Sequence, residues 1–141
     1  MKSLLSTKEL EDYIKQTVNA QIENVSWKDF IFMPITTTSN DGIYIFSTQE
    51  EYLIIQSEKG ITSLVLKSNN QNDILWEVLD IVVFHIALTY ATQVYNHKSD
   101  FRRILFEKEI ELFSLFGDDF KNKKAEIIKS IVEKHPFNDQ K

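Results

Sequence analysis

Hydrophobic and polar positions follow two different rhythms along the chain, and the first of them is helical. From Ser6 onward, apolar residues recur three or four positions apart, with polar residues between them. Glu9 stands three residues after Ser6, which is the spacing of a capping box. The pattern predicts an N-terminal helix over residues 6–24 that buries one face.

A strand-like rhythm replaces the helical one over residues 30–68. Segments rich in β-branched and aromatic residues alternate with turn-forming stretches, and Gly42 and Gly60 suit hairpin connections that need a positive φ. Pro34 cannot donate a ladder hydrogen bond, so its strand is expected at a sheet edge or a bulge. We predict an antiparallel β-meander of three or four strands. Its last hairpin has apolar residues on both faces, so each face should be at least partly covered.

The rest of the chain, residues 72–135, is helical in pattern. Asn72 or Asp73 can cap a helix that is apolar nearly all round and is therefore expected to be central. A helix over residues 100–116 and a last helix that stops before Pro136 follow it. The predicted fold is α+β, with an N-terminal helix, the β-meander and a C-terminal bundle of three helices.

Composition changes this picture in one respect, because it restricts the partners. The 141 residues, 43% hydrophobic with three Gly and two Pro, suit a single domain over residues 1–141. The absence of Cys and of an apolar leader favours the cytoplasm. The longest apolar stretch, residues 81–91, is too short to span a membrane. A net charge of −5 argues against nucleic acid and favours a basic partner.

Candidate catalytic residues lie on the central helix. Glu77 and Asp80 share one face, which is typical of a solvated edge or of acids that pair with a basic side chain, and also suits an acid/base pair. A hydrolase that uses these acids with His85 is kept as an alternative. His97 and His135 lack the spacing with which two imidazoles bind one metal, and phosphate-binding glycine motifs are absent. We therefore expect no enzymatic activity, no cofactor and no metal.

The stretch DFRRILFEKEIELF, residues 100–113, places charges in an otherwise apolar helix. Arg103 and Glu107 are one turn apart and are predicted to pair at the surface. Arg102 and Glu109 fall within the apolar arc, where a charge needs a partner or water. The hypothesis is a structural ion pair from Arg102 to Glu77 or Asp80 of the preceding helix, with Glu109 as a further candidate for a buried ion pair.

Three segments of the chain resemble the immunity protein 63 family of bacterial polymorphic toxin systems: DILWEVLDIVVFHIALTYA, DFRRILFEKEIELF and EKHPFND. The hairpin with its SEKG turn also fits the layout of that family. Asn138 departs from the family pattern, in which Asp is more usual. The residues that carry the resemblance most specifically are Asp100, Phe101, Arg102, Arg103, Phe106, Glu107, Glu111, His135, Pro136 and Phe137.

The resemblance implies a non-enzymatic protein that binds and neutralises a cognate protein toxin. The residues shared with the family are expected to be scaffold, because immunity proteins vary where they contact different toxins. The toxin-binding surface is then expected on exposed acids and aromatics of the meander and the first helix. A structural or adaptor subunit of another complex is a further alternative.

Overall fold

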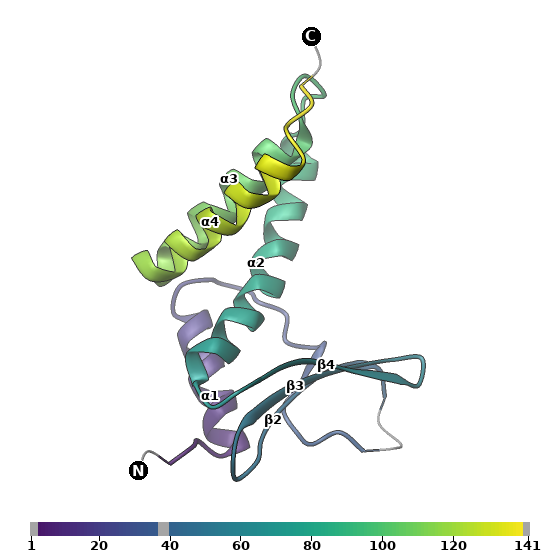
Figure 1. The fold of residues 1–141 in the computed structure, drawn as a ribbon, viewed down its shortest axis with the longest axis vertical. Helices are drawn as coiled ribbons and strands as arrows, with labels where there is room; N and C mark the ends of the chain where they lie inside the picture. Colours follow the sequence, from purple (N-terminus) through teal and green to yellow (C-terminus); the bar gives the residue numbers. More distant parts are fainter. Residues whose placement is uncertain (1–2, 37–39, 140–141) are drawn as a thin grey trace. The chain divides into compact units, whose positions relative to one another are not determined.

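The computed structural model describes residues 3–36 and 40–139. Internal contacts divide the chain into two compact units, residues 1–78 and 79–141, and each unit is described by itself. The single domain expected from the length stays a prediction. The predicted α+β fold is confirmed (Figure 1). The elements are α1 (Thr7–Asn19), β1 (Phe30–Ile31), β2 (Gly42–Ser47), β3 (Tyr52–Glu58), β4 (Ile61–Ser68), α2 (Gln71–Val94), α3 (Phe101–Phe113), a 3-10 turn (Ser114–Phe116) and α4 (Asp118–Lys134).

The start of α1 is fixed by the predicted capping box. The Ser6 hydroxyl accepts a hydrogen bond from the Glu9 N–H at 3.1 Å, and the Glu9 carboxylate accepts one from the Ser6 N–H at 2.8 Å. The helix ends at Asn19, five residues before the predicted end. Ile22, which extended the apolar pattern, is buried all the same, because the chain beyond the helix keeps it against the core. The apolar spacing therefore extends beyond the last residue of the helix.

The sheet has the strand order β1-β2-β3-β4. β2, β3 and β4 form the predicted antiparallel meander, but β1 pairs with β2 in parallel, so the sheet is mixed. Residues 32–41 separate β1 from β2, so the two strands are not joined by the two-residue hairpin that makes neighbours antiparallel. β1 lies at a sheet edge and ends before Pro34, as that proline predicts.

The two glycines of the meander have different roles. Gly60, at φ +80°, forms a two-residue turn with Lys59, at φ +51°, and this is the hairpin geometry predicted between β3 and β4. Gly42 instead begins β2, where an added Cβ would lie 2.6 Å from Cδ1 of Ile31 on the neighbouring strand. Its φ of +156° is a conformation that residues with a side chain rarely adopt, so glycine suits this position through its backbone as well as through the close contact with Ile31. The predicted turn before it includes residues 37–39, which lie outside the described residues.

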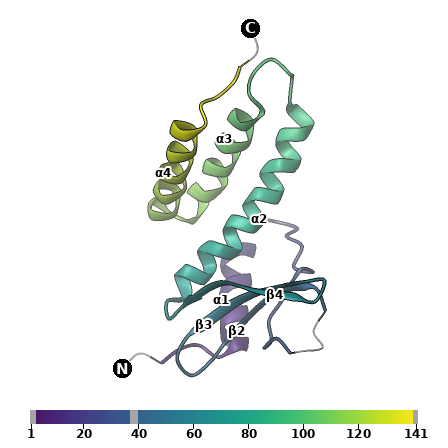
Figure 2. The same ribbon diagram turned by 45° about the vertical axis from the view of Figure 1, so that its right-hand side comes forward.

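The core of the first unit is built from α1, the sheet and the first turns of α2. In both Figure 1 and Figure 2, α1 lies against the sheet. Both faces of β2 are covered, since its consecutive residues Tyr44, Ile45 and Phe46 are all buried. In β3 burial alternates, with Tyr52 and Ile54 buried and the residues after each of them half-buried. The fully buried side chains of this unit are Leu10, Ile14, Val18, Ile45, Tyr52, Ile54, Ile74 and Val78.

The second unit contains the rest of α2 with α3 and α4. Ala87 and Ala91 of α2 are fully buried and form a core with Leu105 of α3. Half-buried aromatic and aliphatic residues pack around this contact. α2 is long and apolar enough to cross a membrane by length and composition, with a mean hydropathy of 1.7 and half of the window buried. Core helices of soluble proteins pass the same test.

Candidate functional site

The three residues of the hydrolase alternative are not brought to one point. Asp80 accepts a hydrogen bond from the Lys124 ammonium at 2.9 Å. His85 is exposed, with its ring edge-on to Phe84 at 5.9 Å between centroids. Asp80 and His85 point about 140° apart around α2, as five helical residues require. Glu77 is half-buried on the same helix. Among the described residues, no group of three or more His, Cys, Asp or Glu could hold a metal ion.

An open hollow beside the start of α1 gives no catalytic arrangement either. It has a volume of about 910 Å³ and lies between the segment before α1 and the β2–β3 turn. Its carboxylates belong to Glu9, which is engaged in the capping box, and to Glu50. The lining residues are Ser3, Leu4, Leu5, Ser6, Thr7, Glu9, Ser47, Thr48, Gln49, Glu50 and Asn69. They place no imidazole or thiol nucleophile in the hollow.

A buried charge network joins the three helices of the second unit. Lys124 of α4 is 7% exposed, and its ammonium lies 3.2 Å from the carboxylate of Glu109 on α3 and 2.9 Å from Asp80 on α2. Burial raises the pKa of Glu109, although the ammonium opposes this shift. Glu109 and Asp80 are therefore members of an ion-pair network, but their partner is Lys124.

Arg102 lies with Asp100 and the C-terminal tail, whereas Glu77 or Asp80 was the predicted partner. Its guanidinium pairs with Asp100 at 2.9 Å and donates hydrogen bonds to the carbonyl oxygens of His135, at 2.9 Å, and Pro136, at 3.0 Å. Arg102 lies in the first turn of α3, where the N-cap carboxylate and the returning C-terminal tail are both within reach. The helical wheel placed it in the apolar arc and gave no information about a tail that folds back.

Arg103 also binds the tail, in place of the predicted pair with Glu107. Its guanidinium binds both carboxylate oxygens of Asp139, at 2.8 to 3.1 Å, and lies 4.1 Å from the ring centroid of Phe137. Asp139 also accepts a hydrogen bond from the Asp100 N–H at 2.8 Å. The bidentate geometry and the stacking on an aromatic face both depend on a guanidinium.

We call this assembly the C-terminal clamp, defined as Asp100, Arg102, Arg103, Phe137 and Asp139. The Arg102 guanidinium and backbone N–H groups hold the pKa of the Asp100 carboxyl well below its usual range. The Arg103 guanidinium lowers the pKa of Asp139 in the same way. Every charge of the clamp is thus used inside the second unit, which leaves little of it for a partner.

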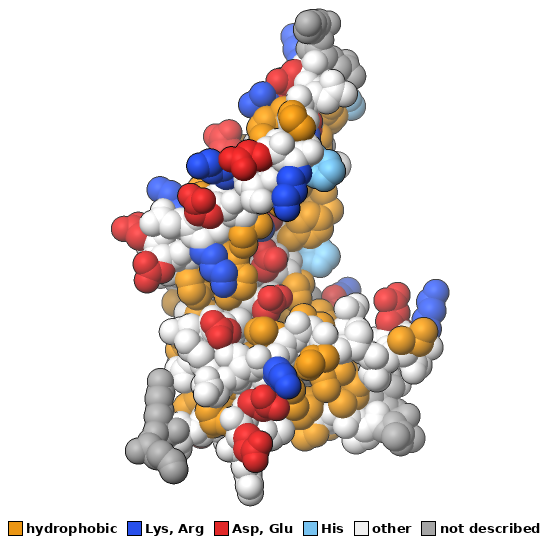
Figure 3. All heavy atoms as spheres, viewed as in Figure 1, with side chains coloured by type: hydrophobic (Ala, Val, Ile, Leu, Met, Phe, Trp, Pro, Cys, Tyr) orange, Lys and Arg blue, Asp and Glu red, His pale blue; other side chains and the backbone are white. Residues whose placement is uncertain are grey.

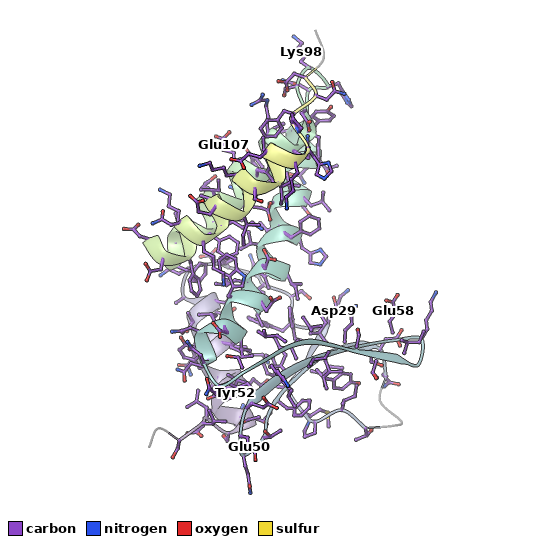
Figure 4. All side chains as sticks on the ribbon, viewed as in Figure 1. Asp29, Glu50, Tyr52, Glu58, Lys98 and Glu107 are labelled. Carbon is purple, nitrogen blue, oxygen red and sulfur yellow. The ribbon has the colours of Figure 1, made fainter. Side chains whose placement is uncertain are left out.

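The remaining residues of the resemblance lie near the clamp or along α3. Phe106 packs with its ring 6.2 Å from that of Phe137, and Phe101 contacts Tyr95 edge-on at 5.2 Å. Glu111 lies 3.4 Å from the Lys108 ammonium, a surface contact of small value. Glu107 is exposed on α3 (Figure 4). The expected scaffold role of these residues stays a prediction that the contacts support.

Charge is distributed unequally between the two units. Residues 1–78 contain eleven acidic and six basic side chains, a balance of −5, whereas residues 79–141 contain ten of each. The first unit therefore carries the whole net charge of the chain. A surface with this excess attracts a basic partner and repels an acidic one.

The acids of α1 contribute less to this field than the acids of the meander. Lys8 and Lys15 pair with Glu11 and Asp12 along the helix, at 2.7 to 3.6 Å. On the meander, by contrast, the acids are exposed at both ends of the sheet. Asp29 and Glu58 lie toward the β3–β4 turn, and Glu50 lies on the β2–β3 turn at the opposite end (Figure 4). We call Asp29, Asp41, Glu50 and Glu58 the meander acids.

The sheet also exposes apolar side chains beside these acids. β4 is the outer strand, and Ile61, Leu64 and Val65 on it are 74%, 56% and 41% exposed. Figure 3 shows hydrophobic side chains gathered over the sheet, with acidic side chains around them. A solvated apolar edge strand with unpaired backbone groups is a common attachment point for another chain.

Sequence reasoning missed three of these features. Lys124 is not among the predicted site residues, although it stands four residues from both Phe120 and Ile128 and so belongs to the apolar stripe of α4. Asp139 carried no local signal, because its partners are 36 and 39 positions away. The exposure of β4 departs from the expectation that each face of the last hairpin is at least partly covered, because most residues of this strand are exposed on both faces.

The family model described as Immunity protein 63 matches residues 48–130, which extend from the β2–β3 turn to α4. The matched region contains β3, β4, α2 and α3, and it stops before the C-terminal tail of the clamp. No curated protein and no solved structure matched the chain.

Proposed function

The chain belongs to the immunity protein 63 family, and from this we propose that it binds a cognate protein toxin and neutralises it by forming a stoichiometric complex in the cytoplasm. Family membership is the observation that carries the proposal. The engaged carboxylate of Asp80 and the exposed, solitary imidazole of His85 are consistent with action by binding.

The distribution of charge supports a basic toxin surface as the partner. The first unit has a balance of −5 and the second unit is neutral, so long-range attraction of a basic protein favours the first unit. Such attraction mainly raises the association rate and suppresses wrong partners. An immunity protein benefits from fast association, because the toxin is harmful for as long as it is free.

The meander acids are the side chains that we propose to face the toxin. All four are exposed, and Glu58 stands at the turn that leads into β4, whereas Asp29 precedes β1 at the other edge of the sheet. The charges of the clamp pair with one another, and Lys124 pairs with two carboxylates of its own unit, so we assign both groups to the scaffold of the second unit. The sequence predicted a toxin-binding surface on the meander and the first helix, and we propose mainly the meander.

A co-expression experiment tests the function. The probe is the protein encoded by the reading frame adjacent to this gene, expressed from an inducible promoter in cells with and without this chain. We expect growth only when this chain is present, and a joint peak of the two proteins on a sizing column. Unchanged killing together with separate elution would contradict the proposal.

A matched pair of charge variants tests the surface. Glu50→Gln with Glu58→Gln, and Glu126→Gln with Glu133→Gln, change the net charge equally, the first on the meander and the second on α4. We expect the meander pair to slow association and to weaken its dependence on salt, because it removes charge near the partner. The α4 pair should associate at the wild-type rate. Equal effects of the two pairs would place the toxin elsewhere.

A further inference from the structure

We propose that the free edge of β4 is the seam at which the toxin attaches, by adding an extended segment of its own chain as a fifth strand of the sheet. This inference rests on the proposed function and specifies how the complex is formed. It identifies the occupant as an extended, β-forming segment of a basic protein.

The backbone of β4 is available for such pairing. β4 is the last strand in the order β1-β2-β3-β4, and within residues 3–36 and 40–139 it forms a ladder with β3 alone. Among the described residues, no further backbone hydrogen bond reaches Ile61–Ser68. The two-residue turn makes Glu58 and Ile61 a hydrogen-bonded pair, so the alternation of the ladder turns the backbone groups of Thr62 and Leu64 away from β3. These groups can accept and donate to an incoming strand.

A row of neighbouring side chains runs across the sheet, and its last member, on β4, is left uncovered. Tyr44, Ile55 and Leu64 are neighbours on three successive strands and share one face. Tyr44 is 3% exposed, Ile55 is half-buried and Leu64 is 56% exposed. Burial thus decreases strand by strand toward the free edge. A fifth strand with an apolar residue opposite Leu64 would cover the end of the row.

Two further apolar residues of β4 are exposed, so the apolar surface continues along the strand. Ile61 begins the strand at 74% exposure, and Val65, at 41%, lies at an irregularity in the pairing with β3. β4 is eight residues long, whereas soluble proteins usually shorten, cover or charge their edge strands. A long edge strand that exposes apolar side chains stays unpaired in solution only where pairing with like edges is opposed.

The charge of the first unit favours a basic toxin segment over a second copy of this chain as the partner of the β4 edge. Pairing two β4 edges would bring together two units that each have a balance of −5. Lys67 near the end of β4 is a side chain that natural edge strands use against self-pairing. A basic segment has the opposite relation to the meander acids, which attract it toward the sheet from both ends. Backbone pairing and apolar contacts would then hold the seam itself.

The first test compares two lysine substitutions at exposed apolar residues. Leu64→Lys changes the seam, and Ile127→Lys makes the same change on α4, where the side chain is 39% exposed. With the product of the adjacent reading frame as the probe, we expect Leu64→Lys to raise the Kd by about tenfold or more, as loss of a central contact does. Ile127→Lys should leave the Kd unchanged. Leu64→Ser, which adds no charge, should weaken binding in the same direction.

The second test observes the backbone directly by hydrogen exchange. We expect the amides of Thr62 and Leu64 to become protected in the complex, because only strand addition gives them acceptors. The Ser63 amide, which already belongs to the ladder, should change less. Protection confined to other elements, or equal Kd values for Leu64→Lys and Ile127→Lys in a complex that still forms, would overturn the seam and leave the proposed function standing. Absence of any complex would overturn the function, and the seam with it.

The oligomeric state of the free chain distinguishes a toxin segment from a second copy as the partner of β4. The free chain should elute as a monomer, since the acidic units repel one another. A dimer that Leu64→Lys dissociates would show that the edge serves a second copy, and this result would overturn the toxin segment as occupant.

Discussion

At the scale of single residues, the charged side chains of the second unit act mainly as internal ties. Lys124 connects one carboxylate from each of the other two helices, at 2.9 and 3.2 Å, while it is 7% exposed. Removing one member of such a network leaves its partner buried without compensation, which costs more than the network contributes. The side chain to disturb is therefore the shared lysine.

Lys124→Met should lower the free energy of unfolding by about 3 kcal/mol, because Glu109 would keep its buried carboxylate without a cation. Urea denaturation at neutral pH measures this loss. Adding Glu109→Gln to Lys124→Met should recover part of it, since no buried charge then remains. Lys129→Met, on the exposed side of α4, is the control and should change stability by less than about 0.5 kcal/mol. A single mutant as stable as this control would contradict a structural network.

Arg102→Met should lower the Tm by several degrees, because the guanidinium joins the N-cap carboxylate to two carbonyl oxygens of the tail. Arg102→Lys should recover little, since an ammonium cannot reproduce the three-way planar geometry. Calorimetry of the three proteins gives the comparison. An Arg102→Met protein that melts with the wild type would show that the clamp does not stabilise the fold.

The carboxylates of Asp100 and Asp139 in the clamp should also make the stability of the protein depend on pH. Because the folded pKa values of Asp100 and Asp139 are lowered by their arginines, their contribution is present above the ordinary aspartate pKa of about 3.9 and is lost as the pH falls below it. Glu109 acts in the opposite sense, because burial raises its pKa and its charged form is the costly one. Thermal melts from pH 5 downward should therefore be flatter for Asp139→Asn than for the wild type. Parallel curves would contradict the clamp.

The elements show where the amino-acid pattern determines the structure and where tertiary contacts decide. The capping box of α1 and the turn before β4 depend on neighbouring residues, so both could be predicted. β1 is only two residues long and its parallel pairing depends on the route of residues 32–41, which no local pattern describes. For the same reason the wheel placed Arg102 and Glu109 correctly on α3 but could not supply partners that come from α4 and the tail.

The capping box at Ser6 should contribute measurably to the stability of the protein. Ser6→Ala should lower the free energy of unfolding by about 1 kcal/mol, because the Glu9 N–H loses its acceptor. Ser6→Gly should cost only a few tenths of a kcal/mol, and Ser6→Asp should keep most of the stability. Chemical denaturation of the three variants ranks them. The opposite order, with Ala the most stable, would show that the cap does not fix the start of α1.

At the scale of the whole molecule, the two units divide the tasks of scaffold and recognition in the proposed function. The second unit is neutral and uses its arginines and its buried lysine internally. The first unit carries the acidic excess and the open edge of the sheet. This division was visible in the sequence only in part, because the net charge was known but the boundary near residue 78 required the structure.

A calorimetric titration of the purified chain with the purified product of the adjacent reading frame decides whether the two proteins bind. We expect a one-to-one complex whose affinity weakens as salt rises, since a basic partner meets the acidic first unit. The toxic activity should be lost as this ratio is reached. No heat of binding, with full toxic activity in an excess of this chain, would show that this protein does not act by binding the toxin.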